Sequence, residues 1–540
     1  MKKQMKLISA AISTALLLGA CAAPNKQANE NTTNAETTAV SSDSTSDVKT
    51  MVYGTTSYGV GMSDAGLNPH ADYSGWSCVR YGVGETLAKF DEQMKPQPWI
   101  ASKWEVSPDH KTWTFTINDK VKFSNGKKVD AAAVKASIER AFAKSNRAKT
   151  FFEYDSMEAN GQQLVIHTTK EYPNMPGLLA DPLFLIVDVQ AEKDGRNFAK
   201  EGPIGTGPYV VKSFTKERAE MAANENYWDG TVPFKTVEIP SIDDPNTRAL
   251  SLQSGDVDMA VNIGPGEIGL FQGNDKFKVD EIASLRVVLA RINQKGILGD
   301  DKVRAAVISA TDRKNYADVL LKGTFIPGSA PIPPSMDYGF NDLKDPNAYN
   351  PERSKQLLAE DGWKDTDGDG ILDKDGKPLT FNFVVYNSRA ELPLYAEAVQ
   401  ADLKKVGIDM KIKTVDYNLI DKMGQDGDYD MLISNIVTAN TGDPIWFLAN
   451  YWHTNNNGSN PQNGSGYSNP QVDQLLDAAE TEFDPAKRRD YAIQIQQLLM
   501  NDGAALFLGY PKTNIVTGSY LKGAVMYPSD YYWITNKITK

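Results

Sequence analysis

Histidines are scarce in this chain, which has four imidazole groups among its 540 residues: His70, His110, His167 and His453. No two of them have the spacing of a zinc site, so the protein alone is poorly equipped to enclose a bare transition-metal ion. Transition-metal ions accept nitrogen and oxygen ligands. A small chelator could therefore supply most of the ligands of such an ion, with one protein histidine completing the coordination shell.

Arginine side chains are the candidates for binding carboxylates, because a planar guanidinium donates two parallel hydrogen bonds and keeps its charge. Arg80 follows Tyr73 and Trp76 in a segment that also contains Tyr81. We expect Tyr73 and Trp76 to form walls of a ligand pocket and Arg80 to contact the ligand. The alternative is that the aromatic residues belong to the core and that Arg80 stacks or forms a salt bridge there.

A run of aspartates resembles the first half of a calcium-binding loop, with carboxylates at alternating positions. Its members are Asp365, Asp367, Asp369 and Asp373. An EF-hand loop carries a bidentate glutamate at its twelfth position, where this chain has Gly376. The sequence therefore predicts either a structural calcium site or a solvated turn that joins a helix to a strand, and no catalytic role.

Composition excludes several classes of protein. The formal net charge is −12 and the pI is about 5.1, whereas a nucleic-acid-binding protein shows a basic footprint. Nothing in the chain resembles a nucleophile elbow, a Walker loop or a dinucleotide fingerprint. The two cysteines, Cys21 and Cys78, form neither a redox nor a zinc motif, and we expect Cys78 to be a buried apolar residue. These patterns require no cofactor.

The N-terminal residues have the pattern of an export signal followed by a tether. Three lysines in the first six residues precede an apolar run that is too short to span a bilayer. We expect residues 1–20 to be a signal peptide whose end resembles a bacterial lipobox, so that Cys21 becomes a lipidated N-terminus. Residues 21–50 are rich in small polar residues and predict a flexible tether. The alternative is an ordinary secretory signal with a chance cysteine.

The first half of the remaining chain combines alternating strand patterns with capped helices. The alternating aromatic and apolar residues over 113–117 predict a half-buried strand. Asp130 has the position of an N-cap before a helix whose apolar residues recur every four positions. Residues 209–211 begin a strand of a predicted β-hairpin. Residues 247–253 predict a short helix that ends at Gly255.

The second half contains a strand–helix–strand unit. Residues 381–386 predict a strand, and apolar residues at helical spacing over 392–406 predict a helix that Gly407 ends. Residues 408–412 then alternate as a second strand. Strands joined by a helix in this way predict parallel pairing and an α/β lobe. An apolar strand over 504–510 follows near the C-terminus.

Three motifs follow one another in a fixed order: Pro203-Ile-Gly-Thr-Gly-Pro-Tyr209, Asn224-Glu-Asn-Tyr-Trp228, and Thr247-Arg248 with Gly255-Asp-Val-Asp258. Together with the segment 113–142, their order and spacing resemble the family-5 solute-binding proteins. These are the extracytoplasmic receptors of ABC importers for peptides and nickel. The resemblance covers nearly the whole chain after residue 50.

The resemblance implies an α/β, two-lobed periplasmic-binding-protein-like fold of type II, cluster C, with a ligand cleft between the lobes. A chain of 540 residues is long enough for more than one core. We expect lobe I to span residues 51–292, with a subdomain at about 88–208, and lobe II to span residues 293–508. Residues 509–540 would return to lobe I. Two crossovers form a hinge, and closure around a ligand is the expected motion.

The same resemblance implies a set of ligand-binding residues in the second lobe. The segment 440–469 is similar to the family's cleft-lining region and would place Asn440, Trp446, Trp452 and His453 at the ligand. His453 would bind nickel through a chelate. The alternative for His453 is a hydrogen-bonded loop residue, and for the two tryptophans it is a place in the core.

Two further positions bear on the choice of ligand. Arg147 stands where nickel-binding members carry an arginine that grips the carboxylates of a metal chelate; the alternative is a surface arginine. Peptide-binding members typically place an aspartate shortly before the Asp443-Pro444 pair to hold the peptide ammonium group. Residues 438–441 contain no carboxylate, and a buried ammonium without a charged partner is costly. This favours a nickel chelate over a free peptide, and we expect Asp443 to cap the following helix.

The resemblance implies that the chain is the substrate-binding component of an ABC importer, which delivers a nickel chelate or an oligopeptide to the permease and ATPase subunits. We expect a monomer without catalytic residues or a nucleic-acid partner, held by lipid at Cys21 on the outer face of the cytoplasmic membrane. Two other classes stay open. One is an exported hydrolase, for which the four scattered histidines offer no constellation. The other is a chemoreceptor adaptor that binds ligand but signals.

Overall fold

The computed structural model describes residues 50–56, 66–71, 73–264, 266–387 and 389–540. The expected signal peptide, Cys21 and all of the expected tether except its last residue lie outside the described residues. Among the described residues, no helix has both the length and the apolar composition needed to cross a membrane.

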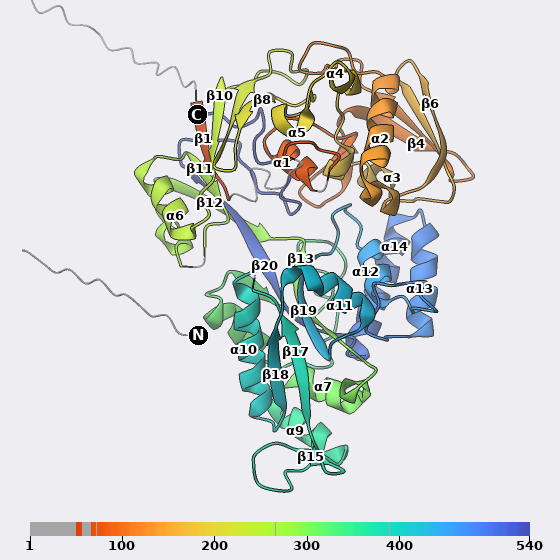
Figure 1. The fold of residues 1–540 in the computed structure, drawn as a ribbon, viewed down its shortest axis with the longest axis vertical. Helices are drawn as coiled ribbons and strands as arrows, with labels where there is room; N and C mark the ends of the chain where they lie inside the picture. Colours follow the sequence, from red (N-terminus) through yellow and green to blue (C-terminus); the bar gives the residue numbers. More distant parts are fainter. Residues whose placement is uncertain (1–49, 57–65, 72, 265, 388) are drawn as a thin grey trace, which may run out of the picture. The chain divides into compact units, whose positions relative to one another are not determined.

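A twelve-stranded sheet runs through the described chain (Figure 1). Its strands in the first part of the chain are β1 (Thr50–Gly54), β8 (Tyr209–Phe214), β9 (Arg218–Ala223), β10 (Thr236–Pro240), β11 (Met259–Val261), β12 (Phe277–Ala283) and β13 (Arg286–Ile292). Its later strands are β14 (Phe325–Pro327), β17 (Thr380–Val385), β18 (Asp409–Thr414), β19 (Met431–Val437) and β20 (Ala505–Gly518). Neighbours follow the order β18-β17-β19-β13-β20-β11-β1-β10-β9-β8, and β12 and β14 also pair with β20.

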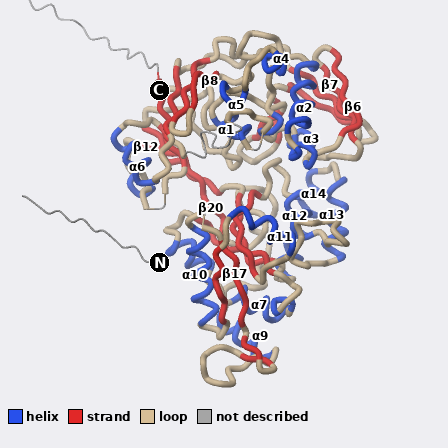
Figure 2. Tube along the Cα trace, in the orientation of Figure 1, coloured by secondary structure: helices blue, strands red, loops and turns tan. Residues whose placement is uncertain are grey.

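The long strand β20 joins two lobes. We call the elements up to β12 lobe I and those from β13 to β19, with the helices between and after them, lobe II. The first residues of β20 pair with β13, and its last residues pair with β11 and β12. Figure 2 shows this strand passing from one lobe to the other. The strand continues beyond the expected end at Tyr510 because its backbone pairs with β12 from Lys512 to Gly518, so the expected boundary between residues 508 and 509 falls inside it.

Lobe I adds a second sheet and short helices. This sheet has the order β4-β5-β7-β6, with β4 (Ala101–Val106), β5 (Thr112–Ile117), β6 (Tyr154–Asn160) and β7 (Gln163–Thr168); β2 (Ala88–Phe90) and β3 (Pro96–Pro98) form a separate pair. The helices are α1 (Ser74–Arg80), α2 (Ala131–Lys144), α3 (Met175–Leu178), α4 (Val189–Lys193), α5 (Phe198–Glu201) and α6 (Pro245–Ser254). Strands β6 and β7 of this sheet contact α2.

Local sequence signals in lobe I are confirmed. Every second residue of β5 is buried, as the alternation predicts. The Asp130 carboxylate accepts a hydrogen bond from the backbone N–H of Ala133 at 2.8 Å and caps α2. Strands β8 and β9 form the expected hairpin, and Gly255 ends α6 with a φ of 84°. Cys78 is fully buried.

Lobe II is an α/β unit, as predicted. Its helices are α7 (Asp301–Ser309), α8 (Arg313–Asn315), α9 (Pro351–Glu360), α10 (Glu391–Lys404), α11 (Ile420–Asp426), α12 (Ile445–Trp452), α13 (Pro470–Thr481) and α14 (Pro485–Asn501), and β15 (Asp373–Lys374) and β16 (Lys377–Pro378) form a small ribbon. Strands β17 and β18 pair in parallel on either side of α10 in the chain. Gly407, with a φ of 83°, turns the chain between them.

Candidate functional site

Asp181 lies where the two lobes meet and binds both of them. Its carboxylate is fully buried and accepts a hydrogen bond from the backbone N–H of Leu183 at 2.9 Å. The same oxygen accepts a hydrogen bond from Arg147 Nη2 at 2.9 Å, and the other oxygen accepts one from Asn440 Nδ2 at 3.0 Å. Because Arg147 belongs to lobe I and Asn440 to lobe II, one carboxylate connects the lobes. We call this contact the Asp181 bridge.

Aromatic rings hold the Arg147 guanidinium in place. Its central carbon lies 4.6 Å from the centroid of the Tyr73 ring and 5.3 Å from that of Phe151. A guanidinium over an aromatic face is attracted by the negative face of the ring. The Arg147 side chain is one-fifth exposed, at 21%. Its charge is therefore oriented by rings on its faces and by Asp181 at one edge.

Two more aromatic residues extend this cluster to Asn440. The Trp76 ring packs edge-on against Tyr531 with 5.5 Å between centroids. The hydroxyl of Tyr531 donates a hydrogen bond to the backbone carbonyl of Asn440 at 3.2 Å. The indole N–H of Trp76 is buried and has no hydrogen-bond partner among the described residues. A buried donor without an acceptor costs free energy, so a ligand oxygen at this point would be stabilised.

Arg80 has the structural role that the sequence left open as its alternative. It forms an ion pair with Asp530 at 2.6 Å, and only 6% of its side chain is exposed. Its guanidinium carbon lies 4.4 Å from the Trp533 ring centroid and 5.2 Å from that of Trp76. Arg80 therefore stacks and forms a salt bridge beneath the aromatic cluster.

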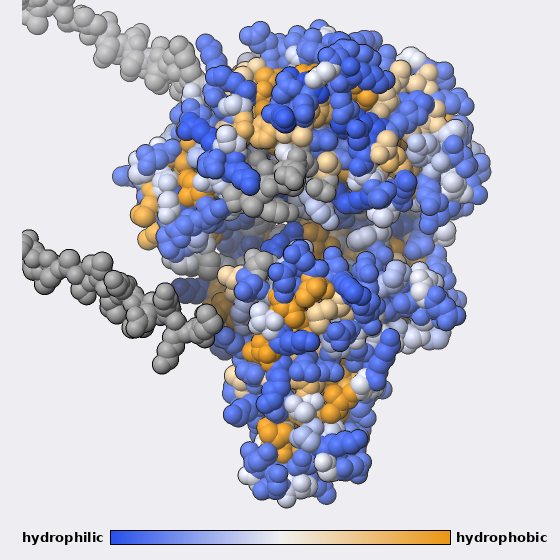
Figure 3. All heavy atoms as spheres, in the orientation of Figure 1, coloured by the Kyte–Doolittle hydropathy of each residue, from blue (hydrophilic) through white to orange (hydrophobic). Residues whose placement is uncertain are grey.

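A cavity of about 530 Å³ lies beside the Asp181 bridge and is lined by both lobes. Phe151 and Asn174 line it from lobe I, and Thr441 and Trp446 line it from lobe II. Asn174 Nδ2 donates a hydrogen bond to the Thr441 carbonyl at 2.8 Å, which adds a second polar contact between the lobes. Figure 3 shows the surface hollowed along the boundary between the lobes. Trp446 is 52% exposed and is thus free to contact a solute.

Comparison with known proteins decides the family. A sequence model of a protein family matches residues 95–459, which is more than half of the chain. The family is the bacterial extracellular solute-binding proteins, family 5, and the model describes its middle part. The chain belongs to the family-5 bacterial extracellular solute-binding proteins. The mixed α/β fold with two lobes is the fold of solved members of this group.

Two relatives, one of them also with a solved structure, illustrate the range of this family. The nickel-binding protein NikA of Staphylococcus aureus is 26% identical over 85% of this chain and 90% of that protein. The probable D,D-dipeptide-binding periplasmic protein DdpA of Escherichia coli is 30% identical over 79% of this chain and 82% of that protein. The crystal structure of Staphylococcus aureus NikA in complex with Ni(L-His)2 has a TM-score of 0.72, with 25% identity over 91% of this chain and 99% of that one.

The solute-binding protein keeps Trp452 in its core. This residue is 2% exposed and packs against Phe447 and Phe507, with 5.2 Å and 6.2 Å between ring centroids. The core alternative given for the tryptophans therefore describes Trp452, whereas Trp446 faces the cavity between the lobes.

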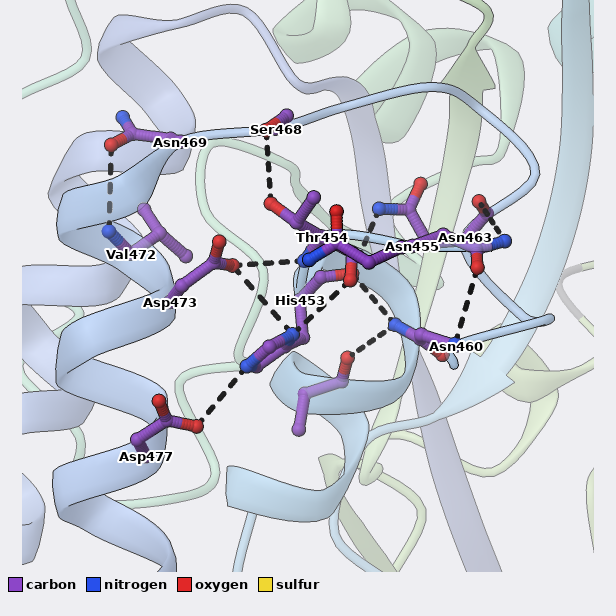
Figure 4. A network of polar contacts seen from close by, with 12 residues as sticks. His453, Thr454, Asn455, Asn460, Asn463, Ser468, Asn469, Val472, Asp473 and Asp477 are labelled. Carbon is purple, nitrogen blue, oxygen red and sulfur yellow. Dashed lines mark hydrogen bonds and ion pairs between the residues drawn. The ribbon is translucent and has the colours of Figure 1, made fainter. Parts of the chain in front are cut away.

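His453 lies in a network of polar contacts with Asp473 and Asp477 of α13 (Figure 4). It follows the last residue of α12, whereas Trp446 lies at the start of this helix, and eight helical residues span about 12 Å. His453 Nε2 lies 3.1 Å from a carboxylate oxygen of Asp477, and Nδ1 lies 3.3 Å from the Thr454 carbonyl. Burial lowers its pKa, but these acceptors and the Asp473 carboxylate outweigh burial, so the pKa is raised. The environment is that of a hydrogen-bonded loop histidine.

The aspartate loop of lobe II forms an exposed turn. Carboxylate oxygens of Asp365, Asp367 and Asp373 lie within 4.8 Å of one another. Asp369 does not belong to this group, and its carboxylate accepts a hydrogen bond from the backbone N–H of Ile371. The Asp365 carboxylate likewise accepts hydrogen bonds from backbone N–H groups within the turn. Calcium binding at this loop stays a prediction.

The sequence did not point to Asp181, which is the residue that organises the site. The chain separates it by 34 residues from Arg147 and by 259 residues from Asn440. The Asp181-Pro182 pair is typical of a turn and gave no sign of a charged contact between lobes. Residues 438–441 contribute no carboxylate, and the Asp181 carboxylate that contacts Asn440 is shared with Arg147.

Asp443 was expected to cap the following helix, but the N-cap of α12 is Pro444. The Asp443 carboxylate accepts a hydrogen bond from the backbone N–H of Ile445 at 2.8 Å and pairs with Arg488.

Proposed function

We propose that this protein is the extracytoplasmic substrate-binding component of an ABC importer, which captures a nickel chelate or an oligopeptide between its lobes and delivers it to the permease. The observation that carries this proposal is the Asp181 bridge, together with the Arg147 guanidinium and the aromatic rings around it. Membership of a family of solute-binding proteins supports it. No covalent chemistry is required of such a receptor.

Ligand capture would act by a shift of population. A ligand that contacts both lobes only in the closed form stabilises that form by its differential affinity. The bridge from Asp181 to Asn440 and the contact from Asn174 to Thr441 are interactions that the closed form makes between lobes. The permease would then recognise the closed form.

A nickel chelate is the ligand that we favour. The Arg147 guanidinium, which Tyr73, Phe151 and Asp181 hold in place, is the cation that a chelate carboxylate would contact. A relative of this chain is a nickel-binding protein, and its solved complex contains Ni(L-His)2. The proposal does not use His453, because that residue lies at the other end of α12 from the cavity.

A peptide ligand is the second candidate. The relative at 30% identity is a probable D,D-dipeptide-binding protein. The Asp181 carboxylate contacts Asn440, but it is fully buried and already pairs with Arg147 at 2.9 Å, so a peptide ammonium group would have to compete with that guanidinium. The sequence argument against free peptides from residues 438–441 therefore still favours the chelate.

We also propose that Cys21 carries the lipid that holds the receptor outside the cytoplasmic membrane, with residues 21–50 as the tether. Export is supported by the match to an extracellular family. In cells, Cys21→Ser should release the protein into the soluble extracytoplasmic fraction. Retention of this variant in the membrane fraction would contradict lipidation at Cys21.

Calorimetric titration tests the ligand. The protein from Asn25 onwards is titrated with nickel alone, with nickel plus L-histidine, and with a random peptide pool. Binding only with nickel plus histidine would establish a chelate receptor, and binding only from the peptide pool would establish a peptide receptor. Arg147→Ala should weaken the observed binding at least about tenfold, whereas Arg218→Ala, at an exposed arginine of β9, should leave it unchanged. Absence of binding in all three titrations would overturn the proposal.

A further inference from the structure

Arg147 and Arg80, the two arginines that pack against Tyr73 and Trp76, each have an aspartate partner. Arg147 pairs with Asp181 at 2.9 Å, and Arg80 pairs with Asp530 at 2.6 Å. Both carboxylates act on Tyr531, whose pKa is raised well above its ordinary value by burial and further by Asp181 and Asp530. The positive charges that would attract an anionic solute are therefore already compensated by carboxylates of the protein.

We propose that Asp181 is a specificity-determining residue, which makes the inter-lobe site select ligands that carry carboxylates together with a compensating positive charge and reject ligands of net negative charge. This inference rests on the proposed function. Suitable ligands are a metal chelate without net charge or a zwitterionic peptide. An excess of ligand carboxylates at Arg147 would lie close to the Asp181 carboxylate.

The burial of Asp181 makes its charge effective. Its side chain has no exposed surface, so solvent does not screen it as it screens an exposed carboxylate. Three donors hold it: the backbone N–H of Leu183, Arg147 Nη2 and Asn440 Nδ2. It cannot turn away from a ligand that binds at Arg147. A ligand of net negative charge must therefore tolerate this carboxylate in the closed form.

Asp181→Asn removes the charge and keeps the shape. An asparagine oxygen can accept the hydrogen bonds of Leu183 and Arg147, and its amide nitrogen can donate to Asn440 once the Asn440 amide turns over. Asp345→Asn is a matched control, because Asp345 also pairs with a buried arginine, Arg313, at 2.8 Å and accepts a backbone hydrogen bond.

The test compares two nickel complexes that differ in net charge. Ni(L-His)2 has no net charge, and a one-to-one nickel–citrate complex has a net charge of −1. Calorimetry gives the affinity of each complex for the wild type, Asp181→Asn and Asp345→Asn. We expect the wild type to prefer the neutral complex, and Asp181→Asn to reduce this preference at least about tenfold. Asp345→Asn should not change it. The same comparison uses tri-alanine and its variant with a central aspartate if the protein binds peptides.

Asp181→Ala removes the same charge together with the side-chain acceptors and serves as a second variant. It leaves Arg147 without this carboxylate, so the preference for the neutral ligand should again fall. An unchanged preference in both Asp181→Asn and Asp181→Ala would overturn the inference while leaving the proposed function intact. Failure of the wild type to bind either nickel complexes or peptides would overturn the proposed function, and the inference with it. Circular dichroism checks that each variant is folded.

Discussion

The ring of Phe483 lies on the ring of His110, with 3.9 Å between their centroids. Phe483 comes from the loop between α13 and α14 in lobe II, and His110 from the turn between β4 and β5 in lobe I. Trp113 stacks on Phe483 as well, at 6.4 Å. The lobes therefore meet through an apolar contact in addition to the Asp181 bridge.

Phe483→Ala should weaken closure without touching the charged site. Aromatic pairs contribute about 0.5–1.5 kcal/mol beyond their buried area, which corresponds to about two- to tenfold in an equilibrium constant. Ligand dissociation, followed by stopped-flow fluorescence, should be faster by about this factor. Tyr349→Ala, at an exposed tyrosine of lobe II, is the control and should dissociate like the wild type. A dissociation rate unaffected by Phe483→Ala would show that this contact does not stabilise the closed form.

His70 should make the fold sensitive to acid. Its Nε2 lies 2.9 Å from the Leu185 carbonyl and its Nδ1 lies 2.9 Å from Arg140 Nη1, so the neutral ring donates to the carbonyl and accepts from the arginine. Burial, followed by the Arg140 charge, lowers its pKa to about 3. Because the unfolded histidine binds its proton first, near pH 6.5, the stability that the neutral ring contributes is lost as the pH falls from 6.5 towards 3.

Urea unfolding at pH 7, 5.5 and 4 measures this effect. Between pH 7 and pH 4, His70 should lower the free energy of unfolding of the wild type by on the order of 3 kcal/mol. The free energy of unfolding of His70→Gln should fall much less over the same range. His167→Gln, at a half-exposed histidine of β7, should follow the wild type. Parallel curves for the wild type and His70→Gln would contradict the assignment.

Glu85 should make the free energy of unfolding fall, rather than rise, as the pH increases. Its buried carboxyl accepts hydrogen bonds from Thr206, Tyr227 and Trp228 at 2.7–2.9 Å. Burial raises its pKa to about 7, although the three hydrogen bonds lower it. The folded carboxyl therefore keeps a proton that the unfolded one loses above about pH 4.5, so its contribution to the free energy of unfolding falls as the pH rises from about 4.5 to 7.

Glu85→Gln isolates this contribution. Between pH 5 and pH 8, this carboxyl should lower the free energy of unfolding of the wild type by on the order of 3 kcal/mol. Glu85→Gln should not show this fall. Glu225→Gln, at an exposed position of the same lobe, should keep the wild-type slope. Equal slopes in Glu85→Gln and the wild type would mean that the three hydrogen bonds keep the carboxyl ionised at neutral pH.

Arg291 is a buried arginine that the fold should tolerate losing. Its residue is 7% exposed, its Nε has no hydrogen-bond partner among the described residues, and its guanidinium lies between the rings of Tyr429 and Tyr451. Replacing a buried charge by an apolar side chain of similar volume is often neutral or stabilising. Arg291→Met should leave the free energy of unfolding unchanged or raise it by about 1 kcal/mol.

Arg304 provides the contrast. It is equally buried, but its guanidinium donates hydrogen bonds to the backbone carbonyls of Leu298, Gly299 and Asp502. Arg304→Met should therefore lower the free energy of unfolding by about 2 kcal/mol or more, because buried carbonyls lose their hydrogen-bond donors. Denaturant unfolding of both variants at pH 7 makes the comparison. A large loss of stability in Arg291→Met would indicate that the faces of the two tyrosine rings compensate the charge of Arg291.

Much of the fold follows from local patterns. The alternation over 113–117, the cap at Asp130 and the strand–helix–strand unit that ends at Gly407 all appear where the sequence predicts them. These elements depend on contacts within a few residues or on a repeating apolar face, and both are visible in the chain. The end of β20 was predicted too early, because its last residues are held by pairing with β12, which is distant in the sequence.

The sequence by itself determined the family, the α/β class and the residue types that a carboxylate-binding site needs. It identified Arg147, Asn440, Tyr73 and Trp76 one by one. Only the tertiary structure decided that Arg147 and Asn440 meet at Asp181, that Tyr73 packs against Arg147, and that Trp452 and His453 lie elsewhere. The physical reason is that a contact between lobes depends on how two separately folded surfaces meet, and no periodicity along the chain records which side chains face each other there.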